Sequence, residues 1–298
     1  MIYSEISSNK LKTVLLITGF LVLIIALGYV FSQYLGEPMI LLIAVAVSIL
    51  MSFGSYFYSD RIVLSISRAQ AITRSDDPEL YQTVENLSIT AGLPTPRIYV
   101  INGPAPNAFA TGRDPKHAVV CITSGLRQKL TQAELEGVMA HELSHVGNYD
   151  IRLSTVIVVL VGIIALLSNW MLRIGFLGRR GRDNNQAGAL LGIVGLVLAI
   201  LSPLAATLIQ LAISRKREYL ADASGALLTR YPKGLAGALR KIAADTQPLR
   251  EANNATAHLF ICNPYKQTLH GRQSGQMLAR LFDTHPPIED RIKRLEAM

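Results

Sequence analysis

The chain has 298 residues, of which 50% are hydrophobic and only 17% are charged, and its mean hydropathy is +0.32. This composition is too apolar for an ordinary soluble enzyme and indicates membrane spans. The formal net charge of +8 does not indicate a nucleic-acid partner, because the basic residues cluster beside the apolar segments without interleaved aromatic residues. Contact with the anionic headgroups of a lipid bilayer is the simpler interpretation.

The chain has four long apolar segments that carry no charge, and two of them lie near its beginning. Each is long enough to cross a hydrocarbon core of ~30 Å. The four segments are residues 13–31, 38–58, 153–172 and 187–214. The first two predict a helical hairpin. Basic residues precede and follow this hairpin, whereas its short connection has none, so both of its ends are expected in the cytoplasm; these residues are Lys10, Lys12, Arg61, Arg68 and Arg74.

The next stretch predicts a soluble region with one helix and two strands. Asp77-Pro78 is typical of a helix start and Gly92 of a helix end. Residues 97–102 and 117–123 are rich in β-branched residues and predict strands, with His117 exposed on the second strand. A substrate in extended form can pair with the edge of such a sheet. Both cysteines, Cys121 and Cys262, are expected to be reduced in the cytoplasm.

The segment His141-Glu142-Leu143-Ser144-His145 carries the most specific chemistry in the chain. Thr131 and Glu134 form a capping box, and the apolar spacing that follows predicts a helix over residues 132–146. Residues four apart share one face of a helix, so both imidazoles can bind one metal ion. Glu142 lies close enough to act as a general base, as in zinc proteases.

The third and fourth apolar segments predict a second hairpin immediately after this helix. Its flanks and its connection carry equal numbers of basic residues, so its orientation is open: it crosses the membrane or is only partly embedded. We favour crossing, with a kink near Ser202 at Pro203. A hairpin returns the chain to its starting side, so the helix after residue 214 is expected beside the two histidines.

A catalytic zinc site needs a third protein ligand and an open position. The other histidines, His117, His258, His270 and His285, and several carboxylates are candidates. Glu218 and Asp222 lie four apart after the second hairpin, so Glu218 can bind the metal while Asp222 holds a ligand imidazole. The alternative is a solvated charged face, since three basic residues adjoin Glu218.

These motifs resemble the HtpX-type bacterial membrane zinc metalloproteases, which are related to the CAAX prenyl endopeptidases. The resemblance covers nearly the whole chain and includes the motif at residues 141–145, the hydrophobic hairpin after it, the segment 217–223 and the motif that begins at Asn107. It implies one Zn²⁺ per chain bound by His141, His145 and Glu218, with Glu142 as the general base.

The same resemblance implies roles for residues farther along the chain. His285, before two prolines, and Arg291, six residues on, match positions that lie near the metal in the relatives, where they can stabilise the oxyanion. Asn107, Ala108 and Phe109 match a segment that leads into a strand beside the cleft and contacts substrate. Residues 246–268 lack periodicity and are expected to cover the cleft as a lid.

The expected fold is therefore α+β and mainly α: an integral membrane protein with four transmembrane helices and a cytoplasmic gluzincin-like domain with a small sheet. The expected division is a transmembrane hairpin at 1–58, the first part of the protease domain at 59–150, a second hairpin at 151–214 and the second part at 215–298.

The resemblance implies endoproteolysis of misfolded or damaged membrane proteins at the cytoplasmic face of the bacterial inner membrane. It also implies a functional link to the AAA membrane protease and a part in the stress response. Two alternatives are open. A zinc-binding scaffold or holdase would close its site with four protein ligands, and an intramembrane protease would need the motif within a span.

Overall fold

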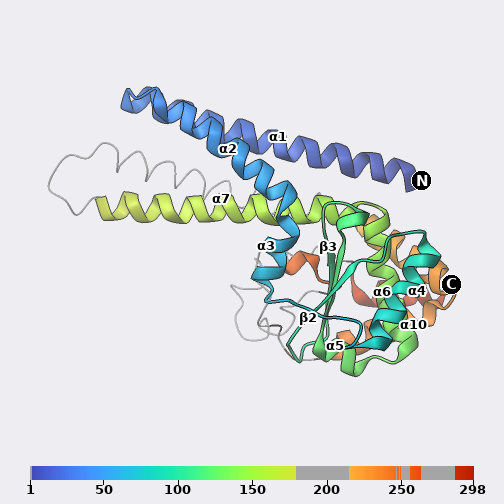
Figure 1. Ribbon diagram of the computed structural model, residues 1–298. Helices are drawn as coiled ribbons and strands as arrows, with labels where there is room; N and C mark the ends of the chain where they lie inside the picture. Colours follow the sequence, from blue (N-terminus) through green and yellow to red (C-terminus); the bar gives the residue numbers. More distant parts are fainter. Residues whose placement is uncertain (1, 179–214, 246, 248, 250–255, 263–285) are drawn as a thin grey trace.

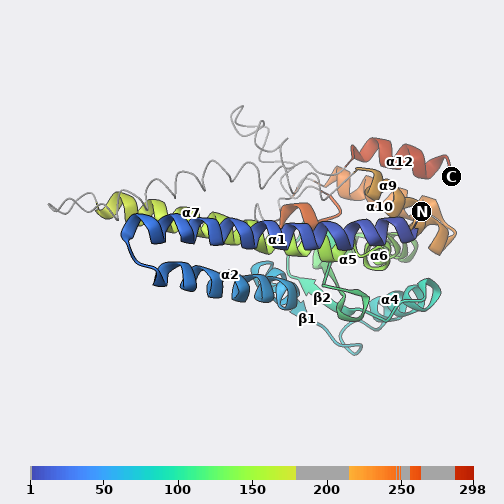
Figure 2. The same cartoon turned by 90° about the horizontal axis from the view of Figure 1, so that it is seen from above.

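The computed structural model describes residues 2–178, 215–245, 247, 249, 256–262 and 286–298. It is mainly helical and has two parts. Three long helices form an arm, and the remaining elements form a body with one small sheet (Figure 1). The N-terminal end of the arm lies beside the body, as both ribbon views show (Figure 2).

The arm begins with the predicted hairpin, formed by α1 (Ile2–Leu35) and α2 (Met39–Phe57). The two helices meet through small residues: a Cβ atom on Gly28 would lie 2.2 Å from the Cβ atom of Ala44, so only glycine allows this approach. Large apolar side chains on both helices face outward, among them Val22 and Leu50, which are 62% and 69% exposed. Such a surface suits lipid rather than water.

The third predicted span lies in α7 (Asp150–Gly178). Two helices in the described part of the chain, α1 and α2, are long and apolar enough to cross a membrane by themselves. The number rises to three if α6 (Gln132–Gly147) and α7, which meet at an angle of 80°, count as one broken span. The prediction of four spans is thus not supported: the described residues give two or three, and the fourth segment, 187–214 with Pro203, lies outside them.

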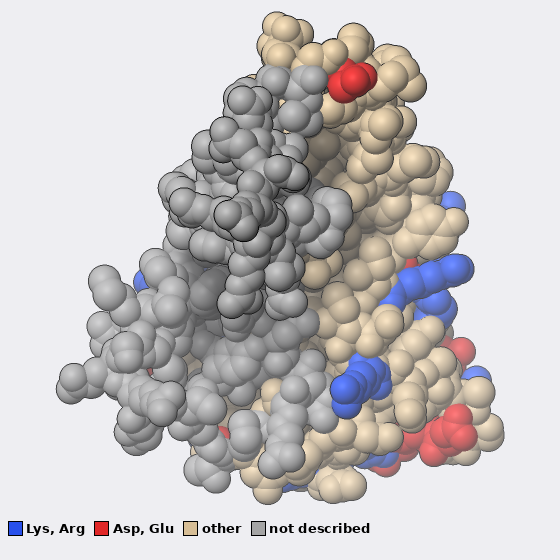
Figure 3. All heavy atoms as spheres, turned by 90° about the vertical axis from the view of Figure 1, so that its left-hand side faces the viewer, with Lys and Arg blue, Asp and Glu red and all other residues tan. Residues whose placement is uncertain are grey.

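The body holds all the described strands and the shorter helices. In chain order these are α3 (Ser59–Ile66), β1 (Gln70–Ala71), α4 (Pro78–Ala91), β2 (Arg97–Ile101), β3 (Ala108–Thr111), η1 (Pro115–His117), β4 (Val119–Thr123), α5 (Ser124–Lys129), α6, α9 (Arg215–Thr229), α10 (Pro232–Ala244), η2 (Ala257–Leu259) and α12 (Ile288–Glu296). Seen from the tip of the arm, the upper part of the described surface is largely uncharged, and charged side chains gather below it over the body (Figure 3).

The strands form one mixed sheet in the order β1-β2-β4-β3. The pairs β1–β2 and β3–β4 are antiparallel, and β2–β4 is parallel. The two predicted strands, β2 and β4, are interior, so neither offers an edge to a substrate; the outer edge beside α6 belongs to β3. His117 is exposed as predicted but lies in η1 rather than in the strand, because Asp114 accepts its backbone N–H and starts a helical turn.

Helix α6 is the centre of the body, with α9, α10 and α4 packed against it and the sheet on another side. Glycines permit the closest approaches: a Cβ atom on Gly225 of α9 would lie 3.0 Å from the backbone nitrogen of His141, and one on Gly137 would lie 2.5 Å from that of Leu235. The buried faces of α6 and of these neighbours form the main hydrophobic core. This packing brings α9 against the half of α6 that carries the histidines.

Candidate metal centre

The helix predicted for the histidine motif is α6, and the structure confirms its predicted start and capping. Thr131 and Glu134 form the capping box, which satisfies backbone N–H groups that the first turn of a helix leaves free. His141 and Glu142 are 1% and 2% exposed. The helix therefore presents its polar face to the interior of the body rather than to water.

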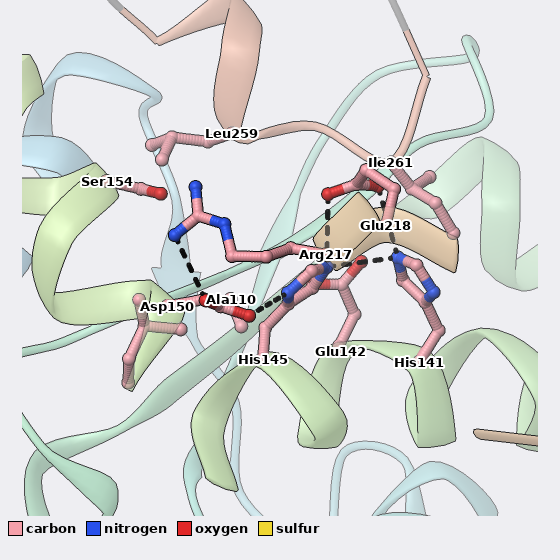
Figure 4. A pocket seen from close by; sticks show the side chains of 11 residues that line it. Ala110, His141, Glu142, His145, Asp150, Ser154, Arg217, Glu218, Leu259 and Ile261 are labelled. Atoms are coloured by element: carbon pink, nitrogen blue, oxygen red, sulfur yellow. Dashed lines mark hydrogen bonds and ion pairs between the residues drawn. The ribbon is translucent and has the colours of Figure 1, made fainter. Parts of the chain in front are cut away.

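Three side chains converge on one point above this face (Figure 4). His141 and His145 rise from α6, and Glu218 reaches them from α9. The two Nε2 atoms are 3.2 Å apart, and Glu218 oxygens lie 3.8 Å from that of His141 and 3.5 Å from that of His145. The three ligand atoms lie within 4.8 Å of one another, a geometry in which one ion can contact all three.

The first histidine is held by the predicted carboxylate. An oxygen of Asp222 lies 2.9 Å from Nδ1 of His141, which leaves Nε2 to face the site. Asp222 is in turn held by Arg291, whose Nε and Nη2 donate to its two oxygens at 2.9 and 2.7 Å. Despite the cost of burial, the nearby Arg291 guanidinium and the His141 hydrogen bond lower the pKa of Asp222 from 3.8 to about 2.

The second histidine is held by a carboxylate that the sequence interpretation missed. Nδ1 of His145 lies 3.0 Å from an oxygen of Asp150. Five residues along a continuous helix would place Asp150 about 140° round the axis from His145. The chain instead breaks at Asn148 and at Tyr149, where φ is 60°, and the 80° bend returns Asp150 to His145. An acidic residue just after a motif of this kind, at a helix break, is the signal that could have found it.

Glu142 lies between the histidines with its carboxylate on the sheet side. The backbone N–H of Ala110 in β3 donates to this carboxylate, and burial is the main reason that the pKa of Glu142 rises from 4.5 to about 7, although the nearby His145 lowers it. A general base works best with a pKa near the working pH. For His145, burial lowers the pKa, but the carboxylates of Glu218 and Asp150 outweigh it and raise the value to about 9.

The three ligands line a cavity together with the base and groups from neighbouring elements. The other lining residues are Ala110, Asp150, Ile151, Ser154, Arg217, Leu259 and Ile261. Leu259 and Ile261 belong to the region predicted as a lid, and of that region the structure describes residues 247, 249 and 256–262. The role of the whole region as a lid over the cleft stays a prediction.

Of the three residues predicted to contact substrate, one makes a contact through its backbone and the other two have buried side chains. Ala108 begins β3, where its carbonyl accepts the backbone N–H of Ile261. The Asn107 amide donates to the carbonyl of Cys262 at 3.0 Å. The side chain of Phe109 is fully buried and stacks edge-on against Phe260, with ring centroids 5.1 Å apart. The side chains of Asn107 and Phe109 therefore fix the strand, and the residue of β3 that lines the cavity is Ala110 rather than one of the three predicted residues.

Of the two residues expected to stabilise an oxyanion, the structure describes one. Arg291 is fully buried and sits behind His141, with Nη1 bound to the carbonyl of Ile261 at 3.0 Å and 4.0 Å from Glu218. It does not line the cavity. His285 lies outside the described residues.

Comparison with known proteins gives the family of the chain that carries this cluster of histidines and carboxylates. Residues 74–298 match peptidase family M48. The chain belongs to peptidase family M48. Proteins described as "Protease HtpX homolog" from Tropheryma whipplei and Dictyoglomus thermophilum are 46% and 48% identical over 302 and 298 residues, covering 100% and 99% of this chain and 99% and 94% of theirs. The chain is thus a metalloendopeptidase with membrane helices.

The fold has a counterpart among solved structures. The crystal structure of Ste24p from S. mikatae matches with a TM-score of 0.51 over 99% of this chain and 67% of that protein, at 18% sequence identity. M48 peptidases depend on zinc, and the donor set fits this ion: two imidazoles and one carboxylate form the three-ligand set of catalytic zinc sites. Both Nδ1 atoms face carboxylates, so each imidazole can direct its Nε2 lone pair toward the metal.

Proposed function

We propose that the chain is a zinc-dependent endopeptidase that cleaves misfolded or damaged membrane proteins at the cytoplasmic surface of the bacterial membrane. The observation that carries the proposal is the convergence of His141, His145 and Glu218 beside the buried carboxylate of Glu142. Bound zinc would polarise the scissile carbonyl and make water acidic enough to lose a proton.

In this proposal the proton chemistry belongs to Glu142. Its carboxylate takes the proton of the attacking water and then delivers it to the departing amine. Burial supports both steps, because a carboxyl with a pKa of about 7 binds and releases a proton at similar cost near neutral pH. The backbone N–H of Ala110 orients the carboxylate toward the cavity.

The substrate would bind in extended form along β3. Ala108 and Ala110 alternate with the residues that face β4, so their backbone groups point to the free edge of the sheet. The carbonyl of Ala108 now accepts the N–H of Ile261, so we propose that a substrate strand competes with residues 259–262 for this edge. Asn107 and Phe109 would act by holding the strand in place.

Arg291 would act mainly as a positioning residue, because its guanidinium is committed to Asp222 and to a backbone carbonyl. The role of His285 in stabilising the oxyanion stays a prediction from the resemblance. The same holds for the number of spans beyond the described helices, the cytoplasmic orientation and the link to an AAA membrane protease.

The alternatives differ in what the site must contain. Among the described residues, the cluster of possible ligands consists of three groups, whereas a structural zinc in a scaffold or holdase is closed by four. A buried general base beside the ligands also has no use in a structural site. For an intramembrane protease the motif would lie within a span. Helix α6, which carries it, counts toward a span only as one half of a broken span with α7, and its packing against α4, α9 and α10 favours a site in the body.

The test uses the full-length protein purified in detergent and a membrane-protein substrate. We expect cleavage by the wild type, loss of cleavage with a chelator and recovery with added zinc. Glu142→Gln should retain one zinc per chain and lose activity by at least about 10²-fold, because only the base is removed. Wild-type turnover by Glu142→Gln would overturn the proposal, and zinc binding without any wild-type proteolysis would favour the scaffold.

A further inference from the structure

The side of the site that holds His145 extends into the membrane arm. Asn9 of α1 is fully buried, and its amide nitrogen donates to an oxygen of Asp150 at 2.7 Å and to the carbonyl of Asn148 at 3.1 Å. Its amide oxygen accepts from Nη1 of Arg217 at 3.0 Å. The Asn9 amide thus uses both N–H groups and its oxygen within the body.

The partners of Asn9 are the groups that define the bend after α6. Asn148 is the C-cap of α6 and Asp150 is the first residue of α7. Helix ends leave backbone carbonyls without an internal partner, and Asn9 supplies one for the C-cap. The same amide holds the one oxygen of Asp150 that does not face His145, since Oδ1 binds Asn9 and Oδ2 binds His145.

Arg217 completes this network from the other side. Its Nη1 also binds Oδ1 of Asp150 at 3.1 Å, and it directly precedes the ligand Glu218. Its side chain is 6% exposed and that of Asp150 is 7% exposed. In so buried a setting the orientation of a carboxylate is set by its hydrogen bonds rather than by water. Asp150 therefore has its two oxygens divided between the ligand histidine and a pair of anchors, Asn9 and Arg217.

The length of α1 is compatible with this contact. Its 34 residues extend about 51 Å at 1.5 Å per residue, whereas the hydrocarbon core is ~30 Å thick. Lys10 and Lys12 adjoin Asn9 and favour the headgroup level for this turn. The first turns of α1 can hence reach the body while the remainder crosses the bilayer.

We infer that Asn9 is a positioning residue for the zinc ligand His145, acting through Asp150, so that the first membrane helix completes the active site. This inference rests on the proposed role of His145 as a zinc ligand. Asn9 lies outside residues 74–298, which match the peptidase family, so the membrane helix would supply a part of the site that the matched region does not contain.

The test replaces Asn9 with leucine, which is similar in size but has no polar group, in the full-length protein in detergent or nanodiscs. We expect zinc affinity, measured by competition with a chelator, to fall about tenfold, as for other groups that support a metal ligand. We also expect a shifted visible spectrum of the Co²⁺-substituted protein, and a lower kcat with little change in KM. The milder Asn9→Ser, checked for folding by circular dichroism, should show the same changes to a smaller extent.

Thr13→Val is the matched control. Thr13 is 2% exposed and lies one turn farther along α1, and within the described residues its hydroxyl donates to the carbonyl of Asn9 in the same helix. We expect wild-type zinc affinity and an unchanged Co²⁺ spectrum for this variant. Equal losses for Thr13→Val and Asn9→Leu would show that packing of α1, and not the Asn9 amide, is responsible, and would overturn the inference.

A double-mutant cycle tests whether Asn9 acts through Asp150. In an Asp150→Asn background, Asn9→Leu should have no further effect on zinc affinity, whereas independent roles give additive losses. Additivity, or wild-type zinc affinity and an unchanged Co²⁺ spectrum in folded Asn9→Leu and Asn9→Ser, would overturn the inference. Failure of the proposed function is distinct: in that case the wild type itself binds no zinc, or Glu218→Gln binds it as tightly as the wild type.

Discussion

The two histidine ligands are supported in the same way but by different parts of the molecule. His141 is held by Asp222 and Arg291, which come from α9 and α12 and lie within the matched M48 region. His145 is held by Asp150, whose anchors include Asn9 in the membrane arm. On the inference drawn above, one half of the site is completed by the protease body alone, and the other half by Arg217 of the body together with Asn9 of α1.

The largest effect on the free energy of unfolding is expected when Asp222, the carboxylate that supports His141, is replaced by an apolar residue. Asp222→Leu leaves the fully buried guanidinium of Arg291 without the carboxylate that it binds through two hydrogen bonds, and Glu218 at 4.0 Å is its remaining acidic neighbour in the described part of the chain. Breaking a buried pair in this way costs about 3–5 kcal/mol. We expect the free energy of unfolding, measured with denaturant in detergent, to fall by this amount. A loss below about 1 kcal/mol would show that Arg291 finds another partner.

Replacement of each carboxylate by its amide sharpens the comparison. Asp222→Asn and Asp150→Asn should each weaken zinc binding by about 10–100-fold, because each removes the charge that orients an imidazole. Deletion of residues 1–35, which removes α1, should weaken zinc binding further in Asp222→Asn but not in Asp150→Asn. Chelator competition measures the zinc affinity of both variants with and without the deletion. An equal further loss of zinc affinity in both variants would contradict the division of the site.

The His141 side also predicts a dependence of stability on pH. The pKa of Asp222 is lowered from 3.8 to about 2 in the folded state, so its contribution is fully present above pH 3.8 and is lost as pH falls through about 2. The shift corresponds to about 2 kcal/mol. In metal-free protein, the stability difference between wild type and Asp222→Asn should shrink by about this amount across that range. A constant difference would contradict the assigned cause.

The smallest effect is expected for Arg291→Lys. The charge is kept, but a lysine cannot make the two parallel hydrogen bonds that Nε and Nη2 make to Asp222. We expect a loss of about 1 kcal/mol in the free energy of unfolding, in line with one hydrogen bond lost while the charge is kept, and a modest fall in zinc affinity. A loss equal to that of Asp222→Leu would mean that geometry, not charge, dominates this pair.

Sequence patterns predicted the parts of this molecule that depend on local order. The capping box placed the start of α6, Asp77 and Gly92 bounded α4, and the spacing of Glu218 and Asp222 placed both carboxylates on one face of α9. These features depend on residues within one or two turns of each other, so periodicity and capping rules suffice.

The parts that were missed depend on the path of the chain between elements. Asp150 reaches His145 only because the helix breaks at Tyr149, and Asn9 reaches Asp150 only because α1 lies against the body. The edge strand beside the site, β3, was expected only from the resemblance at Asn107 and not from a strand pattern, and the two strands that were predicted from their residues, β2 and β4, pair in parallel inside the sheet. Tertiary packing decides such contacts; the position of Asp150 just after the motif is a hint in the sequence, but the spacing of residues does not by itself give the path of the chain.

The central claim is that one zinc ion is held by two histidines and one glutamate and that the remaining position is open for catalysis. X-ray absorption at the zinc edge, on the Glu142→Gln protein to prevent self-cleavage, tests it most directly. The account predicts two imidazole nitrogens and oxygen ligands at about 2.0–2.2 Å, with one imidazole lost in His145→Ala and the glutamate oxygen in Glu218→Gln. A sulfur ligand at about 2.3 Å, or a spectrum unchanged by Glu218→Gln, would contradict it.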